Sequence, residues 1–184
     1  MAEERRVRAD AQRNLGVVLE AAKAVFADSG VDAPVREIAA RAGVGVGTLY
    51  RHFPQRSDLV VAVFRQEIDA CADAASTLAA EYEPADALVR WLRRFTELIG
   101  TKKGLAAALH SGDSAFEALP AYFDGRMQPV LKSLLDSASA AGSVRADVDP
   151  NDLLHAVAYL CMSTDGRQSA RMVDLLIDGL RFGA

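Results

Sequence analysis

The sequence lacks several features that would place it in other classes of protein. It has no run of about 18 apolar residues, the length that a membrane-spanning helix needs, and its first residues, MAEERRVRADAQRN, lack the apolar segment of a signal peptide. We therefore expect a cytoplasmic protein with no membrane partner. The alternation of apolar and polar residues that marks β-strands is also absent. The sequence thus predicts an all-α fold.

Cysteine and recognisable catalytic groups are scarce as well. Cys71 and Cys161 are far apart and have no neighbouring Cys or ligand-spaced His, which favours two reduced, buried thiols over a disulfide framework or a zinc site. Neither His110 nor His155 has an Asp or Ser partner in the sequence, and the Asp-x-x-His spacing of metal ligands occurs only once, at Asp152 and His155. We predict no catalytic residue, no metal and no cofactor.

The chain also lacks an excess of basic residues. The chain of 184 residues has a net charge of −4, of which residues 1–60 carry 9 Lys and Arg against 8 Asp and Glu, and residues 61–184 carry 12 against 17. The acidic balance therefore belongs to the C-terminal part. Phosphate binding depends on where the cations lie, so a local basic face is still possible in the N-terminal part, but charge alone does not indicate a nucleic-acid-binding protein.

What the sequence does contain is a helix-turn-helix pattern from Val35 to Arg56, VREIAARAGVGVGTLYRHFPQR. Two short helices that cross through a tight turn need a small residue where they approach, which Ala39 supplies, and a turn residue that tolerates positive φ, which Gly43 supplies. Ile38, Val44 and Leu49 can then share one apolar core. This spacing is typical of DNA-binding helix-turn-helix motifs.

The longer string IAARAGVGVGTLYRHFPQRSDL resembles the DNA-binding signature of the TetR family of bacterial transcriptional regulators. The residues that match are Ile38, Ala39, Ala42, Gly43, Val44, Gly47, Thr48, Leu49, Tyr50, Phe53, Arg56 and Leu59. The chain departs from the family pattern at Gly45, where Ser or Thr is usual, and at Pro34 and Val35, where Thr often begins the first motif helix. The segments TKKGLAAAL and GSVRADVDPNDLL are similar to a branch of the family common in actinobacteria.

Three N-terminal helices are predicted, over residues 10–29, 34–41 and 45–52, with Asp32 as the cap of the second. Residues 1–9 are expected to form a flexible arm, either touching DNA or simply solvated. Gly47 is expected to be required by packing. The third helix would enter the major groove with Val46, Thr48 and Arg51 reading bases. The full set of predicted DNA contacts is Arg36, Gly45, Val46, Thr48, Tyr50, Arg51, His52 and Arg56.

The C-terminal part is predicted to form further helices, over about 57–80 with Ser57 as its cap, 84–99, 103–110, 114–141 with an interruption or bend near Pro120, Gly125 and Pro129, 150–162 and 167–182. The total is about nine helices. Aromatic residues cluster in this region and either line a ligand pocket or fill a core. The predicted pocket residues are Phe64, Trp91, Phe95, His110, Phe116, Tyr122 and Met127.

The last two predicted helices are apolar on more than one face, which suits a symmetric partner copy. The family resemblance implies that they form a four-helix bundle across a homodimer. The predicted interface residues are Leu153, Val157, Leu160, Val173, Leu176 and Leu180.

These features predict two domains, a three-helix DNA-binding domain over residues 1–56 and a ligand-binding and dimerisation domain over residues 57–184. The resemblance implies a ligand-responsive regulator, most often a repressor. As a homodimer it would bind a palindromic double-stranded DNA operator and be released by a small-molecule effector of unknown identity. The alternatives are an all-α enzyme or small-molecule carrier without operator function, and an architectural DNA-binding protein without ligand control.

Overall fold

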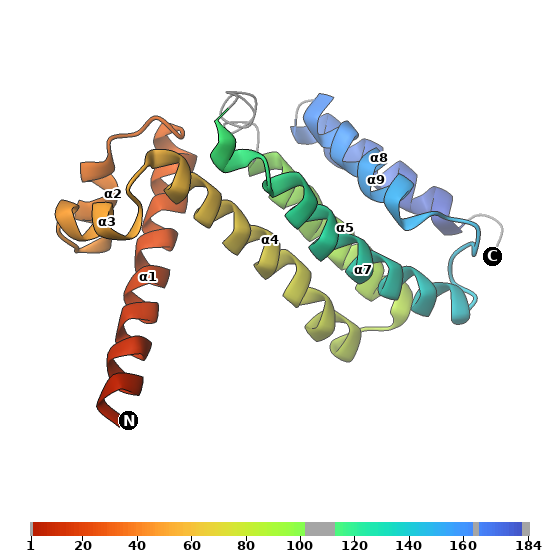
Figure 1. Ribbon diagram of the computed structural model, residues 1–184. Coiled ribbons are helices and arrows are strands. Elements are labelled where there is room, and N and C mark those ends of the chain that lie inside the picture. The colour runs from red at the N-terminus through yellow and green to blue at the C-terminus, as the bar shows by residue number, and fades with distance from the viewer. Residues whose placement is uncertain (1, 102–112, 164–165, 182–184) are drawn as a thin grey trace. The chain divides into compact units, whose positions relative to one another are not determined.

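The computed structural model describes residues 2–101, 113–163 and 166–181, and every regular element in these ranges is a helix (Figure 1). The elements are α1 (Ala2–Ser29), α2 (Val35–Ala42), α3 (Val46–His52), α4 (Arg56–Glu81), α5 (Pro84–Thr101), the short 3-10 helix η2 (Ser114–Phe116), α7 (Leu119–Ala140), α8 (Pro150–Ser163) and α9 (Gly166–Arg181). The prediction of an all-α fold is confirmed. None of the described helices has the length and apolarity needed to cross a membrane.

Packing divides the chain into two compact units, and the division falls within α4. The first unit runs to Gln66 and includes the described residues 113–119, and the second begins at Glu67 and contains α5, α8, α9 and α7 from Pro120 onward. The long helix α4 therefore belongs to both units. The domain boundary expected between residues 56 and 57 stays a prediction.

In the first unit, one apolar core holds α1, α2, α3 and the first turns of α4 together. Its buried members are Val18, Ala21, Ala22, Val25, Ala33, Ile38, Ala39, Leu49, Phe53, Leu59 and Val63. Ile38 and Leu49 are buried and Val44 packs against them, which confirms the shared core expected from the motif. Because a helical hairpin alone buries too little apolar area to be stable, α1 and α4 are needed to hold α2 and α3 in place.

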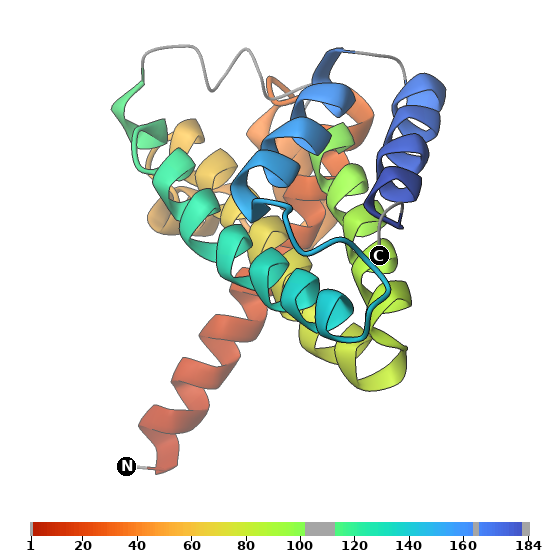
Figure 2. The same ribbon diagram turned by 90° about the vertical axis from the view of Figure 1, so that its right-hand side faces the viewer.

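In the second unit, α5 lies beside α8 and α9 (Figure 2). Leu88, Trp91, Leu92 and Phe95 are all buried, and the Trp91 and Phe95 rings stack with their centroids 5.6 Å apart. The Trp91 indole N–H donates to the carbonyl oxygen of Cys71 at 2.9 Å, so its one polar atom is satisfied inside the core. Cys71 and Cys161 are both buried and neither forms a disulfide, as predicted.

Several helix ends differ from those expected. α1 begins at Ala2, so the prediction of a flexible arm over residues 1–9 is wrong for residues 2–9; these residues contain no Pro or Gly and are mostly Ala, Glu and Arg, which favour helix. Likewise α2 begins after Pro34 without a side-chain cap, which removes the predicted capping role of Asp32. At the start of α4, Asp58 rather than Ser57 supplies the cap, because its carboxylate accepts from the N–H of Gln55 at 2.9 Å.

Two differences concern the later helices. The stretch predicted over residues 114–141 is divided after Phe116 into η2 and α7, and α7 then continues through Pro129. α5 extends past Gly100 to Thr101. Gly142, with φ of 68°, follows the end of α7. The short helix predicted over residues 103–110, which includes His110, lies outside the described residues.

Candidate functional site

The turn between α2 and α3 is closed by backbone hydrogen bonds around Gly43. Gly43 has φ of 67°, a left-handed conformation that an L side chain rarely adopts. Its N–H donates to the carbonyl of Ala40 at 3.2 Å, and the N–H of Val44 donates to that of Ala39 at 3.0 Å. This pair of bonds satisfies the last carbonyls of α2 and fixes the direction in which α3 leaves the turn.

One face of α3 is open to solvent while the other is anchored in the core. Leu49 and the following Phe53 are buried, whereas Val46 and Tyr50 are 41% and 49% exposed. Gly45, Gly47, Arg51 and His52 are exposed as well, and Thr48 is half-buried. The core therefore holds a short helix whose N-terminal residues are available to a partner, which is the arrangement that a helix needs to enter a groove of DNA.

The arginines near α3 differ in whether their guanidinium groups already have partners within the chain. Arg51 is exposed and its Nε donates to the carbonyl of Gly47 at 3.4 Å, so its side chain lies along the N-terminal half of α3. Arg41 instead forms an ion pair with Asp28 at 2.9 Å. Arg36 is exposed and has no polar partner among the described residues. Arg36 and Arg51 are thus the cations on this surface with the most donors to spare.

Arg56 has a different position from the one expected of a phosphate contact. Its guanidinium donates to the carbonyl of Val31 and, at 2.5 Å, to that of Ala33, in the loop that leads into α2. The side chain is half-buried and ties the start of α4 to this loop. The prediction that Arg56 binds DNA is therefore revised to a structural role, in which its guanidinium donates to two carbonyls of this loop.

Gly47 is not required by packing, contrary to expectation. A Cβ added to Gly47 would meet no atom within 4 Å outside the backbone of its own helix, and one added to Gly45 would meet only the Thr48 hydroxyl at 3.8 Å, an ordinary contact. Glycine inside a helix costs about 1 kcal/mol relative to alanine. No packing contact within the chain explains why glycine rather than alanine occupies position 47. The other explanation that the sequence suggested is the close approach of a partner to the α3 backbone.

Gly47→Ala separates these two explanations. We expect the free energy of unfolding to rise by about 0.5–1 kcal/mol, because alanine is the better helix former and has room, while binding to DNA weakens. Urea denaturation measures the first effect and fluorescence anisotropy the second. Gly16→Ala in α1 is the matched control, since its added Cβ also meets nothing and it lies away from α3. A destabilised Gly47→Ala variant would restore the packing explanation.

The aromatic residues proposed to line a ligand pocket mainly fill cores. Trp91, Phe95 and Met127 are fully buried in the second unit, and Phe64 and Phe116 are buried in the first. The structure therefore favours the core interpretation for all five. His110 lies outside the described residues. Tyr122 is half-buried and takes part in the polar network described next.

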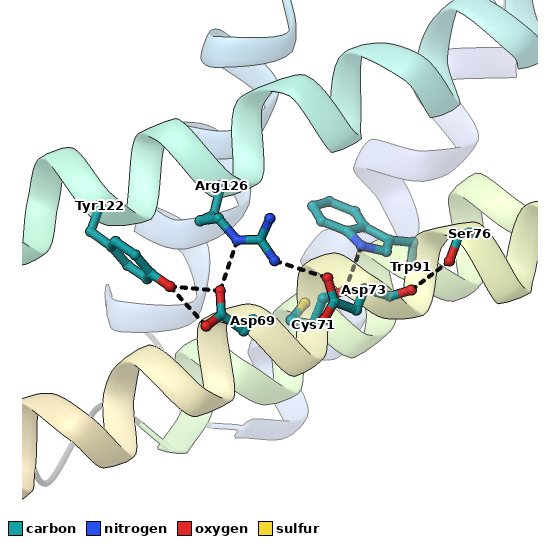
Figure 3. A network of polar contacts seen from close by, with 7 residues as sticks. All are labelled: Asp69, Cys71, Asp73, Ser76, Trp91, Tyr122 and Arg126. Carbon is teal, nitrogen blue, oxygen red and sulfur yellow. Dashed lines mark hydrogen bonds and ion pairs between the residues drawn. The ribbon is translucent and has the colours of Figure 1, made fainter. Parts of the chain in front are cut away.

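That network joins α4 to α7 in the second unit (Figure 3). The Tyr122 hydroxyl lies 2.7 Å from both carboxylate oxygens of Asp69, and the Nε of Arg126 donates to Asp69 at 2.7 Å. A second guanidinium nitrogen of Arg126 reaches Asp73 at 2.8 Å. The hydrogen bonds to Asp69 and then to Asp73 raise the pKa of the Arg126 guanidinium above its ordinary value. One cation from α7 thus bridges two carboxylates one turn apart on α4.

Removing this bridge with Arg126→Gln should lower the free energy of unfolding by about 1 kcal/mol at low salt, and by less at high salt, because the pairs are partly exposed. Denaturation at two salt concentrations measures the difference. Lys132→Gln on the same helix is the control: it removes one exposed pair with Asp136 within α7, which we expect to contribute no more than ~0.5 kcal/mol. Equal losses in the two variants would mean that the α4–α7 bridge contributes no more than one exposed ion pair within a helix.

A cleft does occur in the second unit, at another place. Residues of α5, α8 and α9 enclose about 470 Å³, within the range of small-molecule sites. Sequence reasoning missed it, because its lining consists of small, polar and charged residues from three helices, whereas the residues expected to form a pocket were chosen mainly for their aromatic side chains.

The surface of α8 and α9 also differs from the predicted dimer interface. Leu153, Val157, Val173 and Leu180 are buried inside the chain and cannot form an outer surface, while Leu160 and Leu176 are half-buried. The large apolar side chains that these helices do expose are Tyr159 at 73%, Met162 at 57% and Leu175 at 72%. Four of the six predicted interface residues are therefore internal, and the large apolar side chains that α8 and α9 expose are different ones.

Comparison with known proteins covers both parts of the chain. Residues 18–63 match the bacterial regulatory proteins of the tetR family, and residues 83–182 match the C-terminal domain of SbtR-like transcriptional regulators. HTH-type transcriptional regulators of Staphylococcus aureus are 39% identical over 64 residues, which is 34% of this chain. That match spans only 35% of the length of these curated relatives.

Solved structures match over nearly the whole chain. A TetR transcriptional regulator from Streptomyces coelicolor is 38% identical, with 92% of this chain and 99% of that chain covered and a TM-score of 0.78. The TetR transcription regulatory protein from Mycobacterium vanbaalenii is also 38% identical, with 95% and 99% covered and a TM-score of 0.72.

Proposed function

The chain belongs to the TetR family of bacterial transcriptional regulators, with a DNA-binding N-terminal domain, and we propose that it is a homodimeric, ligand-responsive repressor of a palindromic operator. The family consists of DNA-binding regulators rather than enzymes, which removes the enzyme alternative. The observation that carries the proposal is the exposed N-terminal half of α3, held by a buried core on its opposite face.

In the proposed complex, α3 lies in the major groove. Val46, Thr48 and Arg51 contact base edges, and Arg51 has the donors that suit guanine. Arg36, Tyr50 and His52 contact phosphates beside the groove, and the exposed backbone at Gly45 and Gly47 lets the helix approach closely. Arg56 acts indirectly, by fixing the loop before α2 against α4.

We propose that a second copy of the chain covers the exposed face of α8 and α9. Tyr159, Met162 and Leu175 would then be buried against the same residues of the partner, as two-fold symmetry requires. Two α3 helices about one turn of DNA apart, ~34 Å, would read the two halves of a palindrome.

Release by an effector requires a difference in affinity between two states. To move the protein from 1% to 99% in the form that does not bind DNA, a ligand must prefer that form by ~5.5 kcal/mol. The helix shared by both compact units, α4, is the element through which binding in the second unit would act on α3. Its bridge to α7 through Arg126 contributes to the position of α4 within that unit.

The test is fluorescence anisotropy with labelled DNA from upstream of the gene and of its neighbours. We expect specific binding that weakens steeply with salt, since phosphate contacts release counterions, and two chains per operator. A scrambled duplex of equal length is the control. Absence of salt-sensitive, specific binding at every promoter tested would contradict the proposal.

A further inference from the structure

We propose that the cleft between α5, α8 and α9 binds a small anionic amphiphile, a molecule with an apolar body and a carboxylate or similar acid group. The cleft lies entirely within the second compact unit and is separate from the aromatic core around Trp91. Its assignment as the effector site rests on the proposed function, but its ligand chemistry follows from the lining alone.

The interior of the cleft suits an apolar body. Its volume of about 470 Å³ is enough for a small molecule, and its walls are mostly apolar. Cys161 of α8 and Val173 of α9 are buried residues that line the cleft, and Ala170 is an exposed lining residue with a small side chain. Placing an apolar ligand here removes its surface from water, which is the main source of affinity for such sites.

Arg93 supplies the anchor for an acid group. It lines the cleft from α5, and one guanidinium nitrogen contacts Asp174 of α9 at 3.4 Å, a long contact between side chains that are 64% and 55% exposed. A guanidinium can donate two parallel hydrogen bonds to one carboxylate, which is a stronger arrangement than this single contact. A ligand carboxylate would therefore compete well with Asp174 for Arg93.

The charges around Arg93 favour an anion over a cation. Arg93 also borders a second hollow of about 510 Å³ between α4 and α5, which is lined by Arg90 and Arg94 as well. Arg90 lies over the ring of Tyr82, and Arg94 has no polar partner among the described residues. The two hollows share Arg93 and Glu97, so their combined lining contains three arginines and two carboxylates, those of Glu97 and Asp174. This is a local excess of positive charge in a chain whose net charge is −4.

The experiment compares probes that differ only in charge. Octanoate, octylamine and octanol share one hydrocarbon chain, and 1-naphthoate adds an aromatic acid; isothermal titration calorimetry measures their binding to the full chain without DNA. We expect at least one of the acids to bind more tightly than octylamine and octanol. Stronger binding of the amine or the alcohol, or no binding of either acid at millimolar concentration, would overturn the proposal.

Variants then locate the site. Arg93→Gln should weaken binding of the acid about tenfold, the effect of losing a charged hydrogen-bond donor. Asp174→Asn should strengthen it, because Arg93 loses its competitor, and Glu97→Gln should leave it intact or slightly stronger. If the Arg93–Asp174 ion pair served only to stabilise the fold, both variants would change the affinity for the acid in the same direction. That result would also overturn the proposal.

Ala170→Leu adds volume to the lining of the cleft and should block binding without removing Arg93. Circular dichroism would verify that the fold is kept. Unchanged affinity in this variant would place the ligand elsewhere. Because these measurements contain no DNA, they are independent of the proposed function. A chain that binds the acid but no operator would contradict only the proposed regulatory function. A chain that binds an operator but no acid would contradict only the proposed ligand site.

Discussion

Leu175→Asp should convert the proposed dimer into a monomer and lower operator affinity by about 10²–10⁴-fold. Leu175 is 72% exposed in the single chain and lies on the same helix pair as the exposed Tyr159 and Met162. If a partner covers this face, the new carboxylate would lose its water without gaining a cation, which costs several kcal/mol in each copy. A monomer contacts only one half of the operator and loses the advantage of linked binding. Sedimentation velocity and anisotropy measure the two effects.

Ala79→Asp is the matched control for this variant, because it places the same charge on an exposed position of α4. It should leave both mass and operator affinity unchanged. If Leu175→Asp still sediments as a dimer, the exposed face of α8 and α9 is not the interface, and the proposed symmetry of the complex must be rebuilt on another surface.

The sequence predicted exposed apolar surface on α8 and α9, but most of the residues selected for it are buried inside the chain. Both helices are apolar on more than one side, so periodicity alone could not tell the side that packs against α5 from the side that stays exposed. Val157 and Val173 are on the inner side, and Tyr159 and Leu175 are on the outer side. That distinction depends on how three helices pack together, which is tertiary information.

The turn of the helix-turn-helix was more predictable because its determinants are local. The positive φ of Gly43 and its hydrogen bonds involve residues within five positions along the chain, and the burial of Ile38 and Leu49 follows from short-range spacing. The role of Arg56 could not be read in the same way. Its partners, the carbonyls of Val31 and Ala33, are more than twenty residues away, and only the fold brings them together.

The role of the glycines near α3 could not be predicted from the sequence either. A glycine in a helix can mean either tight packing or the approach of a partner, and the two cannot be distinguished without coordinates. The free space around Gly47 decides against packing inside this chain. The same space around Gly45 means that the missing hydroxyl at this position is not a consequence of crowding.

Arg51→Ala should lower operator affinity by about 2–6 kcal/mol, the other large effect that the structure leads us to expect. A bidentate contact to guanine contributes about 1–3 kcal/mol, and a dimer on a palindrome makes it twice, at two sites far enough apart to be additive. Because Arg51 is exposed and makes only a long contact with its own helix, the variant should keep its free energy of unfolding. Binding should be compared between the operator and duplexes with single substitutions, since loss of a base contact also relaxes specificity at that base pair.

Two other arginines of the same unit make this test specific. Arg41→Ala removes an equal charge that is already paired with Asp28, and it should change operator affinity by less than about 0.5 kcal/mol. Arg56→Ala should instead lower the free energy of unfolding by roughly 2 kcal/mol, because the loop carbonyls lose a charged donor, and weaken DNA binding only through the altered loop. If Arg41→Ala weakened binding as much as Arg51→Ala, and equally for every duplex, the contribution of Arg51 would be one of general charge, and base reading would have to be assigned to Val46 and Thr48.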